Sequence, residues 1–86
     1  MPTLQLYGTD WCGQTKTLAA HLRFLKVPFT FRNVEQDPDA DWEVRAMNDG
    51  KLKFPMVTLD DTHLKNPDVL TLEKALEYAG LIDPFM

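Results

Sequence analysis

Several residue patterns that define large classes of protein are missing from this chain of 86 residues. It has one cysteine, so it forms no internal disulfide, and with two histidines it cannot supply the four Cys and His ligands of a structural zinc site. No apolar run approaches the length of about 20 residues that a transmembrane helix needs. Met1-Pro2-Thr3 begins no basic segment with an apolar one behind it, so we expect no secretory signal and a cytoplasmic location.

Positive charge is also scarce. Nine Lys and Arg residues stand against thirteen Asp and Glu residues, which gives a net charge of −4. Nucleic acids and anionic membranes are bound by clustered positive charge, so neither partner is expected. The remaining composition, 44% hydrophobic and 26% charged, is that of a folded protein. A chain this short is expected to form a single domain, spanning residues 1–86.

Hydrophobic spacing predicts an alternation of strands and helices. We expect strands at 3–7, 29–34, 56–59 and 62–64, and helices at 13–26, 37–50 and 66–80. Asp37-Pro38 and Asn66-Pro67 are each typical of a helix cap followed by proline in the first turn, and Val27-Pro28 is expected to end the first helix.

The order of these elements predicts an α/β fold. Strands joined through a helix are expected to run parallel, by right-handed crossovers. The last two strands, joined by a turn at Asp60-Asp61, are expected to be antiparallel. The simplest arrangement is a mixed four-stranded sheet, in the order β-α-β-α-β-β-α, flanked by three helices.

The strongest chemical signal is Cys12, which lies between the first expected strand and the first expected helix. A sulfur at the amino end of a helix meets unpaired N–H groups and the positive end of the helix dipole, which stabilise a thiolate. The dipole contributes at most about 2 kcal/mol, so direct hydrogen bonds must add to it. Thr15 lies on the same helical face and can donate its hydroxyl, while Lys16 adds positive charge and Asp10 opposes it.

Other interpretations of these residues remain open. Cys12 can be a small buried hydrophobe, Trp11 can line a groove or cover the core, and Thr15 can bond the sulfur or lack a useful contact with it. His21 lies nine residues beyond Cys12, about 13 Å along a helix, so the two do not form a catalytic pair.

Six short motifs together resemble the glutaredoxin family, and in particular its small mycoredoxin-like members. They occur in order along the chain: Gly8-Thr9, Trp11-Cys12-Gly13, Glu35-Gln36-Asp37-Pro38, Asn48-x-Gly50, Phe54-Pro55 and Asn66-Pro67. The resemblance implies the thioredoxin fold and exchange between thiols and disulfides.

The resemblance also implies roles for individual residues. Cys12 is expected to be the nucleophile, with Thr15 beside it in the position of the second cysteine of two-cysteine members. Pro55 is expected to follow a cis peptide bond. Substrate is expected to bind along Trp11, Gly13, Gln14, Phe54 and Pro55. Because Thr15 replaces a cysteine, the chain resembles a monothiol member.

A monothiol member is expected to be a monomer that needs no fixed cofactor. Its partners are a small thiol, glutathione or mycothiol, and client proteins that carry that thiol. Relatives have a glycine after Asp60 where this chain has Asp61, which is expected to weaken a site for the thiol's carboxylate. Two alternatives stay open: a [2Fe–2S] cluster held between two subunits, and a non-catalytic binding module of the same fold.

Overall fold

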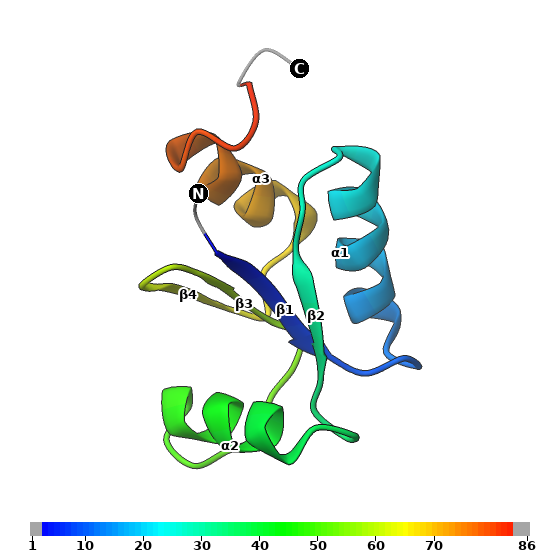
Figure 1. Cartoon of the computed structure of the whole chain (residues 1–86), viewed down its shortest axis with the longest axis vertical. Coiled ribbons are helices and arrows are strands. Elements are labelled where there is room, and N and C mark those ends of the chain that lie inside the picture. The colour runs from blue at the N-terminus through cyan, green and yellow to red at the C-terminus, as the bar shows by residue number, and fades with distance from the viewer. Residues whose placement is uncertain (1–2, 84–86) are drawn as a thin grey trace.

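The computed structural model describes residues 3–83; residues 1–2 and 84–86, the two ends of the expected domain, lie outside the described part. Four strands and three helices alternate in the expected order (Figure 1). Their bounds are β1 Leu4–Gly8, α1 Gly13–Phe24, β2 Thr30–Asn33, α2 Pro38–Met47, β3 Met56–Leu59, β4 Thr62–Lys65 and α3 Val69–Tyr78. No helix within residues 3–83 is long and apolar enough to cross a membrane.

The strands form one mixed sheet in the order β2-β1-β3-β4. The parallel pairing of β1 with β2 and the antiparallel pairing of β3 with β4 confirm two predictions. The prediction that β2 and β3 run parallel is wrong, because β3 is antiparallel to β1. The non-helical segment 48–55 carries the chain back from α2, so β3 starts at the same end of the sheet where β2 finishes.

Local capping explains where the helices begin and end. Asp37 caps α2 as predicted, because its carboxylate accepts the N–H groups of Asp39 and Ala40. The prediction that Asn66 opens the last helix is wrong. Asp68 is the cap, accepting the N–H of Thr71 at 2.7 Å, and so α3 starts at Val69.

The first helix ends two residues earlier than predicted. Lys26 adopts a left-handed φ of 59°, and the N–H of Val27 donates to Leu22 O at 3.0 Å, which closes the last turn. The closure is the Schellman arrangement that glycine usually makes, and α3 makes it with Gly80. The proline after Val27 is therefore not needed to stop the helix.

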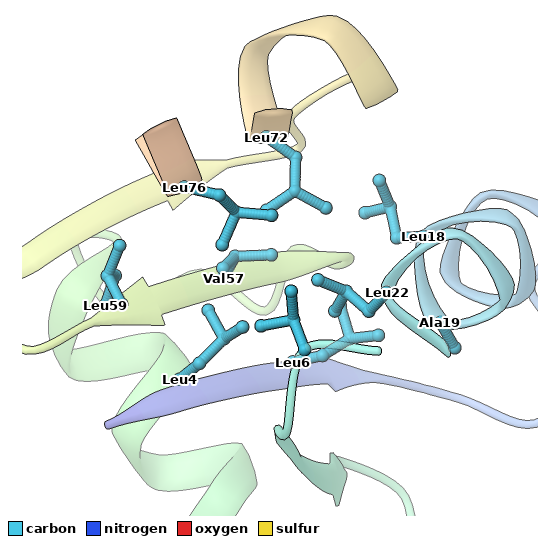
Figure 2. Close-up of a cluster of buried hydrophobic side chains, with 10 residues drawn as sticks. Leu4, Leu6, Leu18, Ala19, Leu22, Val57, Leu59, Leu72 and Leu76 are labelled. Atoms are coloured by element: carbon cyan, nitrogen blue, oxygen red, sulfur yellow. The ribbon is translucent and has the colours of Figure 1, made fainter. Parts of the chain in front are cut away.

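The two faces of the sheet carry separate hydrophobic clusters. On one face, α1 and α3 pack their leucines against β1 and β3 (Figure 2). On the other, Ala40 and Val44 of α2 pack against Tyr7 and Met56. Figure 1 shows α2 lying apart from the other two helices, with the sheet between them. The sheet thus presents the ends of β1 and β2 and the start of β3 together at one edge of the molecule.

Candidate active site

Cys12 is the residue that caps α1, with extended backbone angles of φ −75° and ψ 119°. Its own N–H donates to the hydroxyl oxygen of Thr9 at 3.2 Å, and its carbonyl accepts the N–H of Lys16 at 3.0 Å. Thr9 is fully buried, so the turn between β1 and α1 is fixed from inside. The cysteine side chain is partly exposed, which excludes the interpretation of Cys12 as an entombed core residue.

The surroundings of the sulfur favour its charged form. Burial raises the pKa of the Cys12 thiol, but the Thr15 hydroxyl and the backbone N–H groups of Thr15 and Gln14 lower it by more, so the net shift is downward. These groups belong to the first turn of α1, where N–H groups have no partner within the helix. Asp10 and Lys16, which the sequence suggested would act on the sulfur, are not among the causes of this shift.

Thr15 is 1% exposed, and its hydroxyl oxygen is buried with no hydrogen-bond partner among the described residues. The same hydroxyl lowers the pKa of Cys12. Both observations fit a hydroxyl that lies close to the sulfur. It makes no well-formed hydrogen bond to the neutral thiol, and it donates one to the thiolate. A buried hydroxyl without a partner costs free energy, which a bond to the thiolate would recover.

Gly8 makes room for Thr15. A Cβ atom added to Gly8 would lie 2.3 Å from the Thr15 hydroxyl oxygen and 2.4 Å from its methyl group. The end of β1 and the first turn of α1 are therefore in direct contact at this point. Gly8 belongs to one of the motifs that carry the resemblance, but its contact with Thr15 was not predicted from the sequence.

Two aromatic rings lie beside the cysteine. Trp11 is 63% exposed, which excludes the interpretation that it covers the core. Its ring meets Phe54 edge to face, with centroids 5.9 Å apart. The peptide bond between Phe54 and Pro55 is cis, as the resemblance implied, and Pro55 is buried at the start of β3.

The end of β2 and the loop after it hold the same region through two contacts that the sequence did not predict. The carboxylate of Glu35 accepts the indole N–H of Trp11 at 2.8 Å. The amide of Asn33 donates to Asp10 at 3.3 Å. Neither contact has a sequence signal of its own, since each joins residues more than 20 positions apart.

A cleft of about 670 Å³ opens beside the first turn of α1, between that turn and the start of α3. Gly13 and Gln14, two of the predicted substrate-binding residues, line it and are exposed. The other lining residues are Thr17, Leu18, Asn66, Pro67, Asp68 and Val69. The Asp68 carboxylate is the one charged group of this lining.

The expectation for Asp61 is wrong. The turn that contains it joins β3 to β4 next to the Leu59–Thr62 pair, whereas Met56 and Lys65 pair at the end of the sheet nearest Cys12. Asp61 therefore lies at the opposite end of the sheet from the sulfur. Its charge has no bearing on a small thiol bound to Cys12.

Within residues 3–83, no group of three or more His, Cys, Asp and Glu side chains is placed to hold a metal ion. Cys12 is the one cysteine of the chain, so a [2Fe–2S] cluster, which takes four ligands, would receive one from each copy of this chain. The remaining ligands would come from elsewhere. The cluster alternative therefore stays a prediction about an assembly of two chains.

Comparison with known proteins identifies relatives that cover most of this chain. A family model described as Glutaredoxin matches residues 4–64. Mycoredoxin 1 from two strains of Corynebacterium glutamicum is 34% identical over 68 residues, which cover 78% of this chain and 84% of the relative.

Solved structures confirm the fold class predicted from the sequence. A thioredoxin-like protein has a TM-score of 0.77 at 18% identity, covering 86% of this chain and 99% of its own. A glutaredoxin from Archaeoglobus fulgidus has a TM-score of 0.71 at 19% identity, covering 86% of this chain and 85% of its own. The mixed sheet with its three helices is thus the thioredoxin fold.

Proposed function

This chain belongs to the glutaredoxin family, and we propose that it is a monothiol oxidoreductase that removes a small thiol from client proteins through Cys12. Family membership carries the general role in thiol redox chemistry. The observation that supports the specific mechanism is a partly exposed sulfur whose pKa is lowered by the first turn of α1. The thiolate is the attacking form of cysteine, so a lower pKa raises the reactive fraction at neutral pH.

The proposed reaction has two exchange steps. The Cys12 thiolate attacks the small-thiol sulfur of a mixed disulfide; the bond to the client sulfur breaks, and the client leaves as a thiolate that takes a proton from water. A second molecule of the small thiol, as its thiolate, then attacks the same sulfur and releases Cys12. The products are the reduced client and the disulfide of the small thiol. One free small thiol is consumed for each client released, because the disulfide passes from the client to a pair of small thiols, and no second cysteine of this chain is needed.

The groups around Cys12 suit both steps of the reaction. As a thiolate the sulfur accepts hydrogen bonds from the Thr15 hydroxyl and from two backbone N–H groups. These bonds make it a good leaving group in the second step as well as a nucleophile in the first. We propose that the client chain lies along Trp11, Phe54 and Pro55, and that the small thiol occupies the cleft that begins at Gly13.

The cleft favours a small thiol without negative charge. Its lining offers amides and hydroxyls at Gln14, Thr17 and Asn66, and its one charged group is the carboxylate of Asp68. Glutathione would bring two carboxylates to this surface, whereas mycothiol, an amide-linked sugar derivative of cysteine, brings none. The name of the relative, Mycoredoxin 1, points the same way. We therefore propose mycothiol as the preferred co-substrate.

The experiment presents one client protein as its glutathione and its mycothiol mixed disulfide in turn. The protein is added in catalytic amount with the matching free thiol, and the client is weighed by mass spectrometry over time. We expect faster loss of mycothiol from the client, and no turnover with Cys12→Ser. Equal turnover of both adducts would contradict the thiol preference, and turnover by Cys12→Ser would contradict the mechanism.

A further inference from the structure

The exposed ring of Trp11 is held at two points. Its N–H donates to Glu35 at 2.8 Å, and its ring contacts Phe54, which is half-buried against the cluster under α2. A tryptophan that is 63% exposed would ordinarily sample several rotamers. The two contacts fix one of them, with the ring against Phe54, the residue before the cis peptide bond.

Glu35 is itself attached to a rigid part of the fold. The N–H of Val34 donates to Gly8 O at 3.0 Å, and the Val34 side chain is buried. The N–H of Glu35 donates to the side chain of Asn33 at 2.9 Å, and Asn33 in turn contacts Asp10. The Glu35 side chain extends from this fixed backbone, and its carboxylate accepts the Trp11 indole N–H. Its position is therefore set by the core.

We propose that Glu35 is a positioning residue that gives this protein a preference for protein disulfides over small ones, by holding Trp11 in place before a client binds. The proposal rests on the proposed function, because it concerns the same sulfur. A client protein must lay its backbone and side chains across Trp11 and Phe54 to reach Cys12. A small disulfide reaches the sulfur without touching them.

The expected size of the effect follows from the cost of ordering one side chain. Immobilising a side chain on binding weakens an association on the order of two- to tenfold. If Glu35 removes this cost in advance, its loss slows exchange with a protein by that factor. Exchange with a small disulfide is unaffected, and so is the pKa of Cys12, which depends on Gln14 and Thr15.

The test uses single-turnover exchange with disulfides of 5-thio-2-nitrobenzoate, which needs no knowledge of the natural thiol. The Cys12 thiolate attacks the carrier sulfur, the bond to the nitrobenzoate sulfur breaks, and the coloured thiolate leaves. One carrier is serum albumin through its free cysteine, and the other is N-acetylcysteine. We expect Glu35→Ala to react with the albumin adduct two- to tenfold more slowly and with the N-acetylcysteine adduct at an unchanged rate.

Two variants serve as comparisons. Glu35→Gln keeps an oxygen that can accept the indole N–H, so we expect it to retain most of the albumin rate. Asp39→Ala removes an exposed carboxylate four residues away, and we expect it to leave both rates unchanged. Equal slowing by Asp39→Ala would mean that net charge, and not the contact with Trp11, sets the preference, and it would overturn the proposal.

Fluorescence anisotropy tests the positioning itself. In a Trp42→Phe background Trp11 is the one remaining tryptophan, and we expect Glu35→Ala to add a fast component to its decay. Unchanged anisotropy, or equal slowing of both adducts, would overturn the inference. Failure of the unsubstituted protein to react with either adduct would instead contradict the proposed function.

Discussion

At the scale of single residues, the sulfur and the hydroxyl three positions later act as a pair. Thr15 is buried against Gly8, and its hydroxyl has no hydrogen-bond partner among the described residues, yet it lowers the pKa of Cys12. A hydroxyl held in this way donates to a thiolate better than to a thiol, because charge strengthens a hydrogen bond. The position of the second cysteine in two-cysteine relatives is therefore occupied by a group suited to the charged sulfur.

The first prediction concerns this pair. We expect the rate of Cys12 alkylation by iodoacetamide, measured against pH, to have its midpoint below the value of about 8.5 of a free thiol. Thr15→Val, which removes the hydroxyl at nearly constant volume, should raise the midpoint. Thr17→Val removes a hydroxyl from the next turn and should leave the midpoint in place. A midpoint in Thr15→Val equal to that of the unsubstituted protein would show that the hydroxyl does not act on the sulfur.

The second prediction concerns the contact between Gly8 and Thr15. Gly8→Ala forces a methyl group into the Thr15 side chain, so we expect a loss of about 1–3 kcal/mol in the free energy of unfolding. Thr15→Ala removes two of the three clashing atoms. The double variant should therefore be more stable than the sum of the two single losses predicts, as measured by urea denaturation. Strict additivity would contradict direct contact between these side chains.

Much of this site could be predicted from local sequence, and part of it could not. Cys12 and Thr15 were found because the first turn of a helix has a known electrostatic character and a fixed spacing. Thr9 and Glu35 belong to motifs of the resemblance, but their roles were missed: Thr9 accepts the Cys12 N–H, and Glu35 holds Trp11. A threonine in a turn has many possible partners, and the contact with Glu35 exists only after the chain has folded.

At the scale of elements, capping residues were good predictors of where helices lie and poorer predictors of where they begin and end. Asp37 caps α2 as expected, whereas Asn66 adopts a left-handed φ of 48° and donates its N–H to Pro55 O at 2.9 Å. That bond ties the end of β4 to the segment before β3. Tertiary contact therefore decided between two residues of similar capping ability.

The third prediction tests how α1 is held on the sheet. Leu22 is fully buried in the cluster that joins α1 to β1, β3 and α3 (Figure 2). We expect Leu22→Ala to lower the free energy of unfolding by about 2–5 kcal/mol in urea denaturation. Leu70→Ala is the matched control, since Leu70 is 60% exposed on α3 and should change the stability by about 0.5 kcal/mol or less. Similar losses for both variants would contradict the packing described for α1.

The direction of β3 shows what element order leaves undetermined. A helix between two strands usually produces a parallel pair when the strands are neighbours, as β1 and β2 are. β2 and β3 are separated by β1, and segment 48–55 lets the chain return before β3 begins. The hydrophobic pattern gave the number and kind of strands, but not which of them would be neighbours.

At the scale of the whole molecule, the two hydrophobic clusters share the same sheet. Leu6 and Val57 belong to one cluster, and Tyr7 and Met56, their neighbours along β1 and β3, belong to the other. Within residues 3–83 both clusters are therefore built on the same two strands, and a single domain over residues 1–86 stays our prediction. The packing of both clusters also supports the end of the sheet next to Cys12.

The fourth prediction separates the proposed enzyme from the cluster alternative. We expect the protein, purified without oxygen, to be colourless and to elute from a sizing column at the position of a 9.9 kDa monomer. A brown dimer whose visible absorption disappears in Cys12→Ala would favour a [2Fe–2S] cluster between two chains. Absorption that persists in Cys12→Ala would come from a contaminant, because no other cysteine is available.

The packing of Thr15 against Gly8 also affects how the oxidation state of the protein is set by the small thiols around it. Because Thr15 fills this buried position and the chain has no second cysteine, oxidised Cys12 cannot form an intramolecular disulfide. On the proposed mechanism, the share of molecules in the oxidised form then follows the ratio of disulfide to free small thiol around them. The domain would equilibrate with that pool instead of storing two electrons of its own.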